Sequence, residues 1–225
     1  MQSVRKELFD ILKPYFNDRK YKLMNNMGAP QFIRFVESDY VIHFYMNFFS
    51  TNTIFFTRFN ISHWDVENVI LEIGLPNIGL DSYINKDRYF LPTIVDRSVI
   101  NINEDRPLET KKQVQEYAKA IKQYTETNGK AFLDKYSYLP NLLLLMNALE
   151  SEDLNWNNRE KGGLHGSLDA YFRGLIISKL CNDPDFESKL NRMDKKFNDP
   201  SNEEWQPYYE QLKLKLSALS PKYNL

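Results

Sequence analysis

The residues best suited to catalysis or ligand binding lie in a glycine-rich segment between two expected helices. The segment combines glycines with a lysine, a histidine and a serine: Lys161, Gly162, Gly163, His165, Gly166 and Ser167. Backbone N–H groups at the start of a helix attract anions, and glycines let a phosphate come close. His165 is then the candidate catalytic residue for proton transfer. This arrangement predicts an enzyme that acts on a phosphate-bearing or other anionic small molecule.

A second interpretation of this segment carries no catalysis. Its glycine spacing matches neither the P-loop nor the dinucleotide-binding motif, and no expected strand precedes it. The segment is then an interhelical loop in which Ser167 caps the helix that begins near Leu168.

A different set of candidate binding residues lies on expected strands. His43 and Tyr45 share one face of a strand over residues 40–49. Arg34 belongs, with three basic residues at positions 19, 20 and 22, to a small basic patch before the sheet. The chain holds 15 Phe and 14 Tyr, more than a small core needs. Because tyrosine is enriched at protein interfaces, we expect an aromatic-rich surface that engages a protein partner. The alternative for His43 is a hydrogen-bonded histidine of the sheet.

Composition and charge exclude several classes of protein. The hydrophobic share is 42% and the charged share 26%, which is typical of a folded domain. The 29 basic and 30 acidic side chains give a net charge of −1, so we expect no nucleic-acid or membrane partner. The single cysteine and the three widely spaced histidines predict no metal site and no cofactor. The oligomeric state stays open.

The ends and the apolar runs of the chain bear on its location. The first residues are interrupted by charges, so they do not resemble a signal peptide. The longest aliphatic run, residues 142–146, is too short to cross a membrane. We therefore expect a cytoplasmic protein.

The elements that must position these candidates are strands first and helices later. Apolar spacing predicts a first helix that ends at Pro14 and a short helix that ends at Gly74. Between them, residues 31–37, 40–49 and 52–60 are expected to form an antiparallel meander. In its middle strand, Ile42, Phe44 and Met46 are predicted to face the core.

The second half of the chain has a helical pattern. A helix with Pro107 at its start and Asn128-Gly129 at its end is expected first, and others follow. Strands and helices are segregated along the chain, which predicts an α+β fold. In this fold a C-terminal set of about five helices covers the sheet. We expect one domain over residues 1–225, with 1–106 and 107–225 as the alternative sheet-containing and helical parts.

The N-terminal third resembles a family of bacterial domains of unknown function. The resemblance covers residues 3–75 and lies in a helix that ends Ile11-Leu12-Lys13-Pro14, a basic turn at residues 19–22 and the aromatic strands. Some of those domains are suspected immunity or accessory proteins of bacterial toxin systems. The resemblance implies a helix followed by a meander and carries over no catalytic residue.

These observations favour a non-enzymatic cytoplasmic binding protein, immunity-like or accessory, that engages a protein partner. The alternative is an enzyme that uses the Gly162–Ser167 loop on an anionic small molecule.

Overall fold

The computed structural model describes residues 4–26, 29–37, 39–48, 54–76, 91–98, 100 and 107–224. The chain divides into two compact units, each made of two segments. Unit 1 comprises residues 1–61 and 96–135, and unit 2 comprises residues 62–95 and 136–225. The boundaries between the units follow residues 61, 95 and 135.

The sheet is built from β1 (Lys22–Asn26), β2 (Ala29–Val36), β3 (Tyr40–Phe48), β4 (Ile54–His63) and β5 (Ile94–Val95) in that spatial order. Strands β1 and β2 pair antiparallel, as do β2 and β3. The order β2-β3-β4 matches the three strands of the expected meander. The sequence analysis missed β1, because its Lys-Leu-Met-Asn-Asn sequence has few β-branched or aromatic residues.

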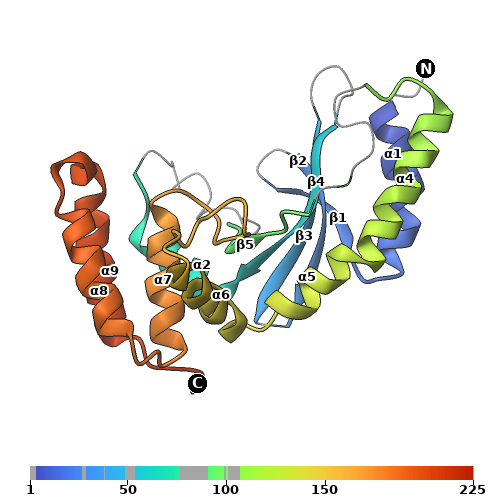
Figure 1. Ribbon diagram of the computed structural model, residues 1–225. Coiled ribbons are helices and arrows are strands. Elements are labelled where there is room, and N and C mark those ends of the chain that lie inside the picture. Colours follow the sequence, from blue (N-terminus) through green and yellow to red (C-terminus); the bar gives the residue numbers. More distant parts are fainter. Residues whose placement is uncertain are drawn as a thin grey trace. The chain divides into compact units, whose positions relative to one another are not determined.

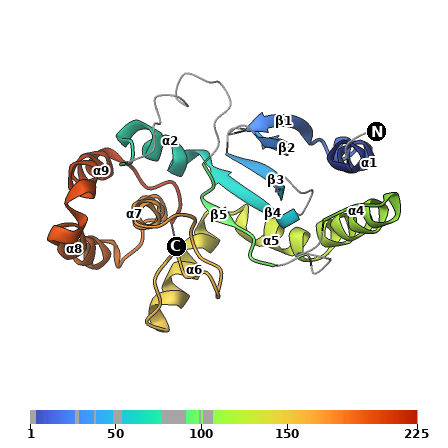
Figure 2. The same ribbon diagram turned by 90° about the horizontal axis from the view of Figure 1, so that it is seen from above.

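Aromatic rings fill the core of unit 1. Helices α1 (Val4–Asn17) and α4 (Lys111–Glu126) lie side by side along the sheet (Figures 1 and 2). Phe16 of α1 stacks on Phe32 of β2 at a centroid distance of 4.3 Å and lies 4.7 Å from Phe44 of β3. The predicted burial of Ile42, Phe44 and Met46 is confirmed, and Val41 and His43 of the opposite face are buried as well.

The expected end of the first helix was wrong. Helix α1 continues past Pro14 to Asn17. A proline inside a helix costs one backbone hydrogen bond. The continuation brings Phe16 into the aromatic core with no exposed surface, and burial of this ring offsets that loss.

The expected ends of the helix after residue 106 were also wrong. Helix α4 starts after Thr110, whose side chain accepts a hydrogen bond from the backbone of Gln113 in a capping box. Asn128 and Gly129 do not end this helix but begin α5 (Asn128–Tyr136).

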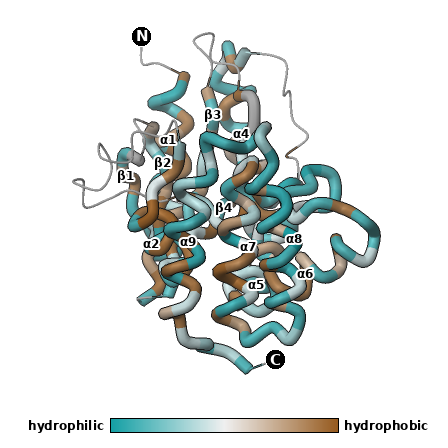
Figure 3. The backbone as a smooth tube through the Cα atoms, turned by 90° about the vertical axis from the view of Figure 1, so that its left-hand side faces the viewer, coloured by the Kyte–Doolittle hydropathy of each residue, from teal (hydrophilic) through white to brown (hydrophobic). Residues whose placement is uncertain are grey.

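Unit 2 is helical and is organised around α7 (Asp169–Leu180). Helices α2 (Trp64–Ile73), α6 (Pro140–Ser151), α8 (Phe186–Phe197) and α9 (Gln206–Ala218) each contact α7, and a 3-10 helix, η1 (Pro200–Trp205), precedes α9. The hydrophobic stretch of α7 and the mainly hydrophilic α8 are visible in Figure 3. Helix α2 ends at Gly74 as predicted.

Trp156 packs tightly against α7. Its ring lies where a Cβ atom on Gly174 would stand, at 2.2 Å from Cε3, and its carbonyl oxygen would be 2.4 Å from a Cβ atom on Gly163. Both positions therefore require glycine so that Trp156 can be buried, with 2% of its surface exposed. The described part of the chain contains no helix long and apolar enough to cross a membrane.

These elements confirm the α+β class. An N-terminal helix precedes a five-stranded antiparallel sheet, α2 lies between β4 and β5 in the sequence, and the other helices follow β5.

Candidate functional site

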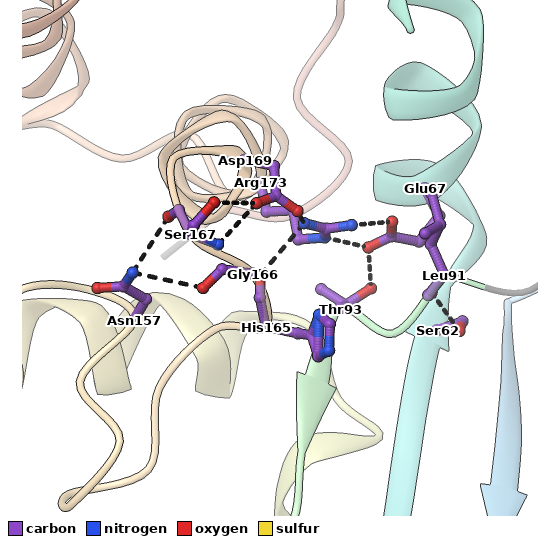
Figure 4. A network of polar contacts seen from close by, with 10 residues as sticks. All are labelled: Ser62, Glu67, Leu91, Thr93, Asn157, His165, Gly166, Ser167, Asp169 and Arg173. Carbon is purple, nitrogen blue, oxygen red and sulfur yellow. Dashed lines mark hydrogen bonds and ion pairs between the residues drawn. The ribbon is translucent and has the colours of Figure 1, made fainter. Parts of the chain in front are cut away.

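A buried network of charged and polar side chains is the most conspicuous polar feature of unit 2. Figure 4 shows Arg173 of α7 between Glu67 of α2 and Asp169 at the start of α7. The Arg173 guanidinium donates to the two Glu67 carboxylate oxygens at 2.8 and 2.9 Å and also forms an ion pair with Asp169. Arg173 has no exposed surface. This fork-to-fork geometry is the strongest arrangement of an arginine with a carboxylate.

Backbone and hydroxyl groups complete the network. The Thr93 hydroxyl donates to Glu67 Oε1 at 2.7 Å and accepts from the His63 backbone N–H at 2.9 Å. Arg173 also donates to the backbone oxygen of His165 at 3.1 Å. The network therefore ties α2, α7 and the loop before α7 into one arrangement within unit 2.

The pKa shifts of these side chains agree with a network of buried ion pairs. Burial raises the pKa of the Glu67 carboxyl, although Arg173 and Thr93 oppose this shift. Burial also acts to raise the pKa of Asp169, but Arg173 and the Ser167 N–H outweigh it and hold the pKa below its usual value. Arg173 stays protonated because both carboxylates favour its charged form. Because Arg173 is fully buried and bonded to both carboxylates, this cluster stabilises the packing of α2 against α7.

The glycine-rich segment forms the loop that carries one side of this network. Lys161 lies at its exposed start and forms an ion pair with Glu152 at 3.1 Å. Gly162 follows in the left-handed region at a φ of 74°, and Gly163 approaches the Trp156 backbone. The His165 backbone N–H donates to the Thr93 carbonyl oxygen at 2.9 Å. The loop is thus fastened by bonds within unit 2.

Ser167 does not act as the expected helix cap. Its backbone N–H donates to Asp169 Oδ1 at 2.7 Å, and its carbonyl oxygen accepts from the Asn157 amide at 3.1 Å. The N-cap position of α7 is Leu168, which has no side-chain capping bond. The chain's own Asp169 carboxylate thus occupies the Ser167 donor that was expected to attract an external anion.

The candidate residues of unit 1 lie on opposite faces of the sheet. Arg34 shares the face of Phe32, and its guanidinium lies 5.0 Å from the centroid of the Tyr21 ring. His43 and Tyr45 belong to the other face. His43 is 1% exposed, and its Nδ1 lies 3.3 Å from Gln31 Oε1, so it is a hydrogen-bonded histidine of the sheet.

Two further kinds of site, a reactive cysteine and a metal centre, can be assessed. Cys181 is buried, and burial raises the pKa of its thiol to about 12, which disfavours the nucleophilic thiolate. Among the residues that the structure describes, no three His, Cys, Asp or Glu side chains are arranged to hold a metal ion.

Sequence reasoning missed the charged network and a nearby cavity. Glu67 and Arg173 are 106 positions apart, and nothing in either local sequence indicates the other. The cavity, of about 270 Å³, is formed by residues from the end of α6, the following loop, α7 and α8. Its aromatic walls, Trp156 and Tyr171, could have been found only by knowing which helices meet.

Comparison with known proteins yields no relative to guide the assignment. No family model, no curated protein and no solved structure matches the chain.

Proposed function

We propose that this chain is a non-enzymatic binding protein that engages a protein partner in the cytoplasm, in an immunity-like or accessory role. The observation that carries this proposal is the edge of the sheet. Strand β1 pairs with β2 on one side, and no described strand pairs with its other side. An edge strand presents backbone N–H and C=O groups to which an extended segment of another protein can add as a further strand.

The side chains of β1 fit such an interaction. Leu23 is 36% exposed, and Lys22 and Asn25 are also exposed. An exposed leucine beside a polar edge offers an apolar contact, and backbone pairing supplies the hydrogen bonds. This proposal moves the expected contact from the aromatic side chains to the edge strand.

The tyrosines support an interface less well than their number suggests. Several are buried, with exposed fractions of 6% or less: Tyr21, Tyr117, Tyr124, Tyr171 and Tyr209. They contribute to the cores of the two units, so the tyrosine surplus alone does not argue for a surface. Tyr45 is half-buried.

The alternative, an enzyme acting through the Gly162–Ser167 loop, lacks a favourable observation. Lys161 is paired with Glu152, and the Ser167 N–H is bonded to Asp169. An external anion would have to displace both contacts. We therefore place the binding function first.

A pull-down with matched variants tests the proposal. Native lysate of the source organism is incubated with the wild-type chain, Leu23→Asp and Leu214→Asp, and captured proteins are quantified by mass spectrometry. Leu214 of α9 is 73% exposed and serves as the control leucine. We expect one stoichiometric protein partner with the wild type and Leu214→Asp, and its loss with Leu23→Asp.

Backbone hydrogen exchange gives a second measurement that needs no variant. Addition of the captured partner should slow exchange of the β1 amides more than that of any other described strand. Capture that is equal for all three baits, or protection that leaves β1 unchanged, would refute the proposal.

A further inference from the structure

The basic patch of the sequence lies at the start of the outermost strand of unit 1. Arg19 and Lys20 belong to the turn after α1, Lys22 is the first residue of β1, and Arg34 is on β2. The Arg34 guanidinium is 5.0 Å from the ring centroid of Tyr21, the residue before β1. The fold therefore gathers these cations beside the strand on which the proposed protein interaction rests.

Most of these cations have no carboxylate partner. Arg19 is the exception, because it forms an ion pair with Glu126 at 2.6 Å. Among the described residues, Lys20, Lys22 and Arg34 form no ion pair, and both lysines are exposed. The Nε atom of Arg34 is buried and has no hydrogen-bond acceptor. Positive charge that the chain itself leaves unneutralised favours a negatively charged partner.

The carboxylates at this end of the sheet lie outside the strand. Asp18 is in the turn after α1, and Glu37 directly follows β2. Strand β1 itself has the sequence Lys-Leu-Met-Asn-Asn, with one cation and no carboxylate. A segment that pairs with β1 would therefore meet a single charge along the strand, and that charge is positive.

The side chains of β1 alternate between the two faces of the sheet. Leu23 is opposite Phe32 of β2 and shares its face, whereas Lys22 is opposite Ile33 on the other face. Leu23 is 36% exposed, and Lys22 is exposed as well. Directly opposite residues on neighbouring strands have Cβ atoms about 5 Å apart. An added strand would therefore meet a leucine on one face and a lysine on the other.

We propose that β1 binds an extended protein segment that alternates acidic and apolar side chains, with an acidic residue beside Lys22 and an apolar residue beside Leu23. This inference rests on the proposed function, because it gives the chemistry of the segment that adds to β1. A shift of one residue in register would place carboxylates beside Leu23 and apolar side chains beside Lys22. The alternation therefore fixes the register as well as the affinity.

The phosphates of a nucleic acid would also be attracted by these cations. A nucleic acid has no peptide groups to pair with the outer edge of β1, whereas an extended peptide donates and accepts hydrogen bonds along it. The net charge of −1 gives the chain little general attraction for a polyanion. The edge geometry thus favours an acidic peptide, and an oligonucleotide serves as a control.

Amide chemical shifts of the isotope-labelled full chain measure binding at β1. The probe is a blocked hexapeptide that alternates glutamate and valine. One comparison peptide alternates lysine and valine, and the other groups all glutamates before all valines. The alternating acidic peptide should shift the β1 amide signals and bind at least about tenfold more tightly than either comparison peptide. Raising the ionic strength from about 0.05 M to about 0.5 M should weaken this binding.

A pair of lysine variants separates local charge from net charge. Lys22→Glu replaces an attraction with a repulsion, so the Kd for the alternating acidic peptide should rise about tenfold. The matched control is Lys119→Glu on α4 of unit 1, because Lys119 is also exposed and forms no ion pair among the described residues. Both variants change the net charge equally, but only Lys22→Glu should weaken binding.

Several results would overturn the acidic-segment inference. They are the absence of a β1 shift with the alternating acidic peptide at about 5 mM, equal binding of either comparison peptide, equal Kd values in the two lysine variants, and an equal β1 response to an oligothymidylate.

The lysate pull-down distinguishes failure of this inference from failure of the proposed function. Capture that survives Lys22→Glu but is lost with Leu23→Asp would overturn the acidic chemistry and leave the edge-strand interaction standing. Capture that is equal for the wild type, Leu23→Asp and Leu214→Asp would refute the edge-strand interaction itself.

Discussion

The two units bury different kinds of side chain. Unit 1 is held by stacked rings, with Phe16, Phe32 and Phe44 completely buried. Unit 2 buries whole charges: Arg173 lies between Glu67 and Asp169, and Lys189 is paired with Asp183 at 2.6 Å. Aromatic packing tolerates modest change because its energy is spread over many contacts. A buried ion pair does not, since removal of one partner leaves an uncompensated charge.

The largest expected effect therefore comes from unit 2. Arg173→Met leaves the Glu67 and Asp169 carboxylates without their guanidinium, and we expect the free energy of unfolding to fall by about 4–5 kcal/mol. The measurement is urea denaturation followed by tryptophan fluorescence. This signal reports unit 2, because Trp64, Trp156 and Trp205 all belong to it.

A double variant checks that the loss arises from stranded charge. Glu67→Gln in the Arg173→Met background removes one buried carboxylate and should recover part of the lost stability. Equal stability of the single and double variants would contradict the electrostatic explanation.

Unit 1 should respond to loss of packing. Phe44→Ala removes a ring that lies 4.7 Å from Phe16 and 5.0 Å from Phe59, and we expect destabilisation of about 3–4 kcal/mol. Far-UV circular dichroism during urea denaturation is the suitable measurement, because unit 1 contains no tryptophan. Phe35→Ala is the control, since Phe35 is 45% exposed on the same sheet and should cost clearly less. Equal losses would show that ring burial does not set the stability of unit 1.

The pH dependence of unit 1 should depend on His43. Burial lowers the pKa of this imidazole from 6.5 to about 3 in the folded state. The unfolded chain takes up the proton first as the pH falls, so the contribution of His43 to stability is full above about pH 6.5 and declines between about pH 6.5 and 3. Between about pH 7.5 and 5, this one group should cost about 2 kcal/mol.

The variant His43→Gln isolates this contribution. Denaturation curves at the two pH values should show a smaller loss of stability in the variant than in the wild type, by about 2 kcal/mol. The same loss in both proteins would mean that His43 is not the responsible group.

The smallest effect is expected at the surface. Lys130 and Asp134 form an ion pair in α5, and both side chains are 61% exposed. Because water screens this pair, Asp134→Asn should change the free energy of unfolding by less than about 0.5 kcal/mol. A thermal or urea denaturation that shows a change above about 1 kcal/mol would break the distinction drawn between buried and exposed charge.

Local sequence patterns predicted much of unit 1. The alternation in residues 40–49 identified the inward side chains of β3, because a strand turns successive residues to opposite faces. In unit 2, Gly74 also marked the end of α2 correctly. The prediction that the first helix ends at Pro14 was wrong, because burial of Phe16 outweighed the local preference of proline to end a helix.

The candidate site was harder to predict, and the charged network shows why. The segment 161–167 was identified as unusual, but its role depends on contacts with Thr93, Trp156 and Asp169. The tyrosines gave a similar lesson, because residue type does not distinguish a buried ring from an exposed one. The cavity walls come from three helices and a loop, and no spacing in the sequence links them.

The sequence by itself determined the α+β class, the antiparallel meander and the inward face of β3. These features follow from periodicity and turn chemistry, which act between neighbours along the chain. Only the tertiary structure decided that Glu67 meets Arg173, that Asp169 takes the donor at the start of α7, and that two aromatic rings and two cations share a cavity. Such pairings depend on which surfaces pack together, and that choice is made by the whole chain minimising its exposed apolar area and its uncompensated buried charge.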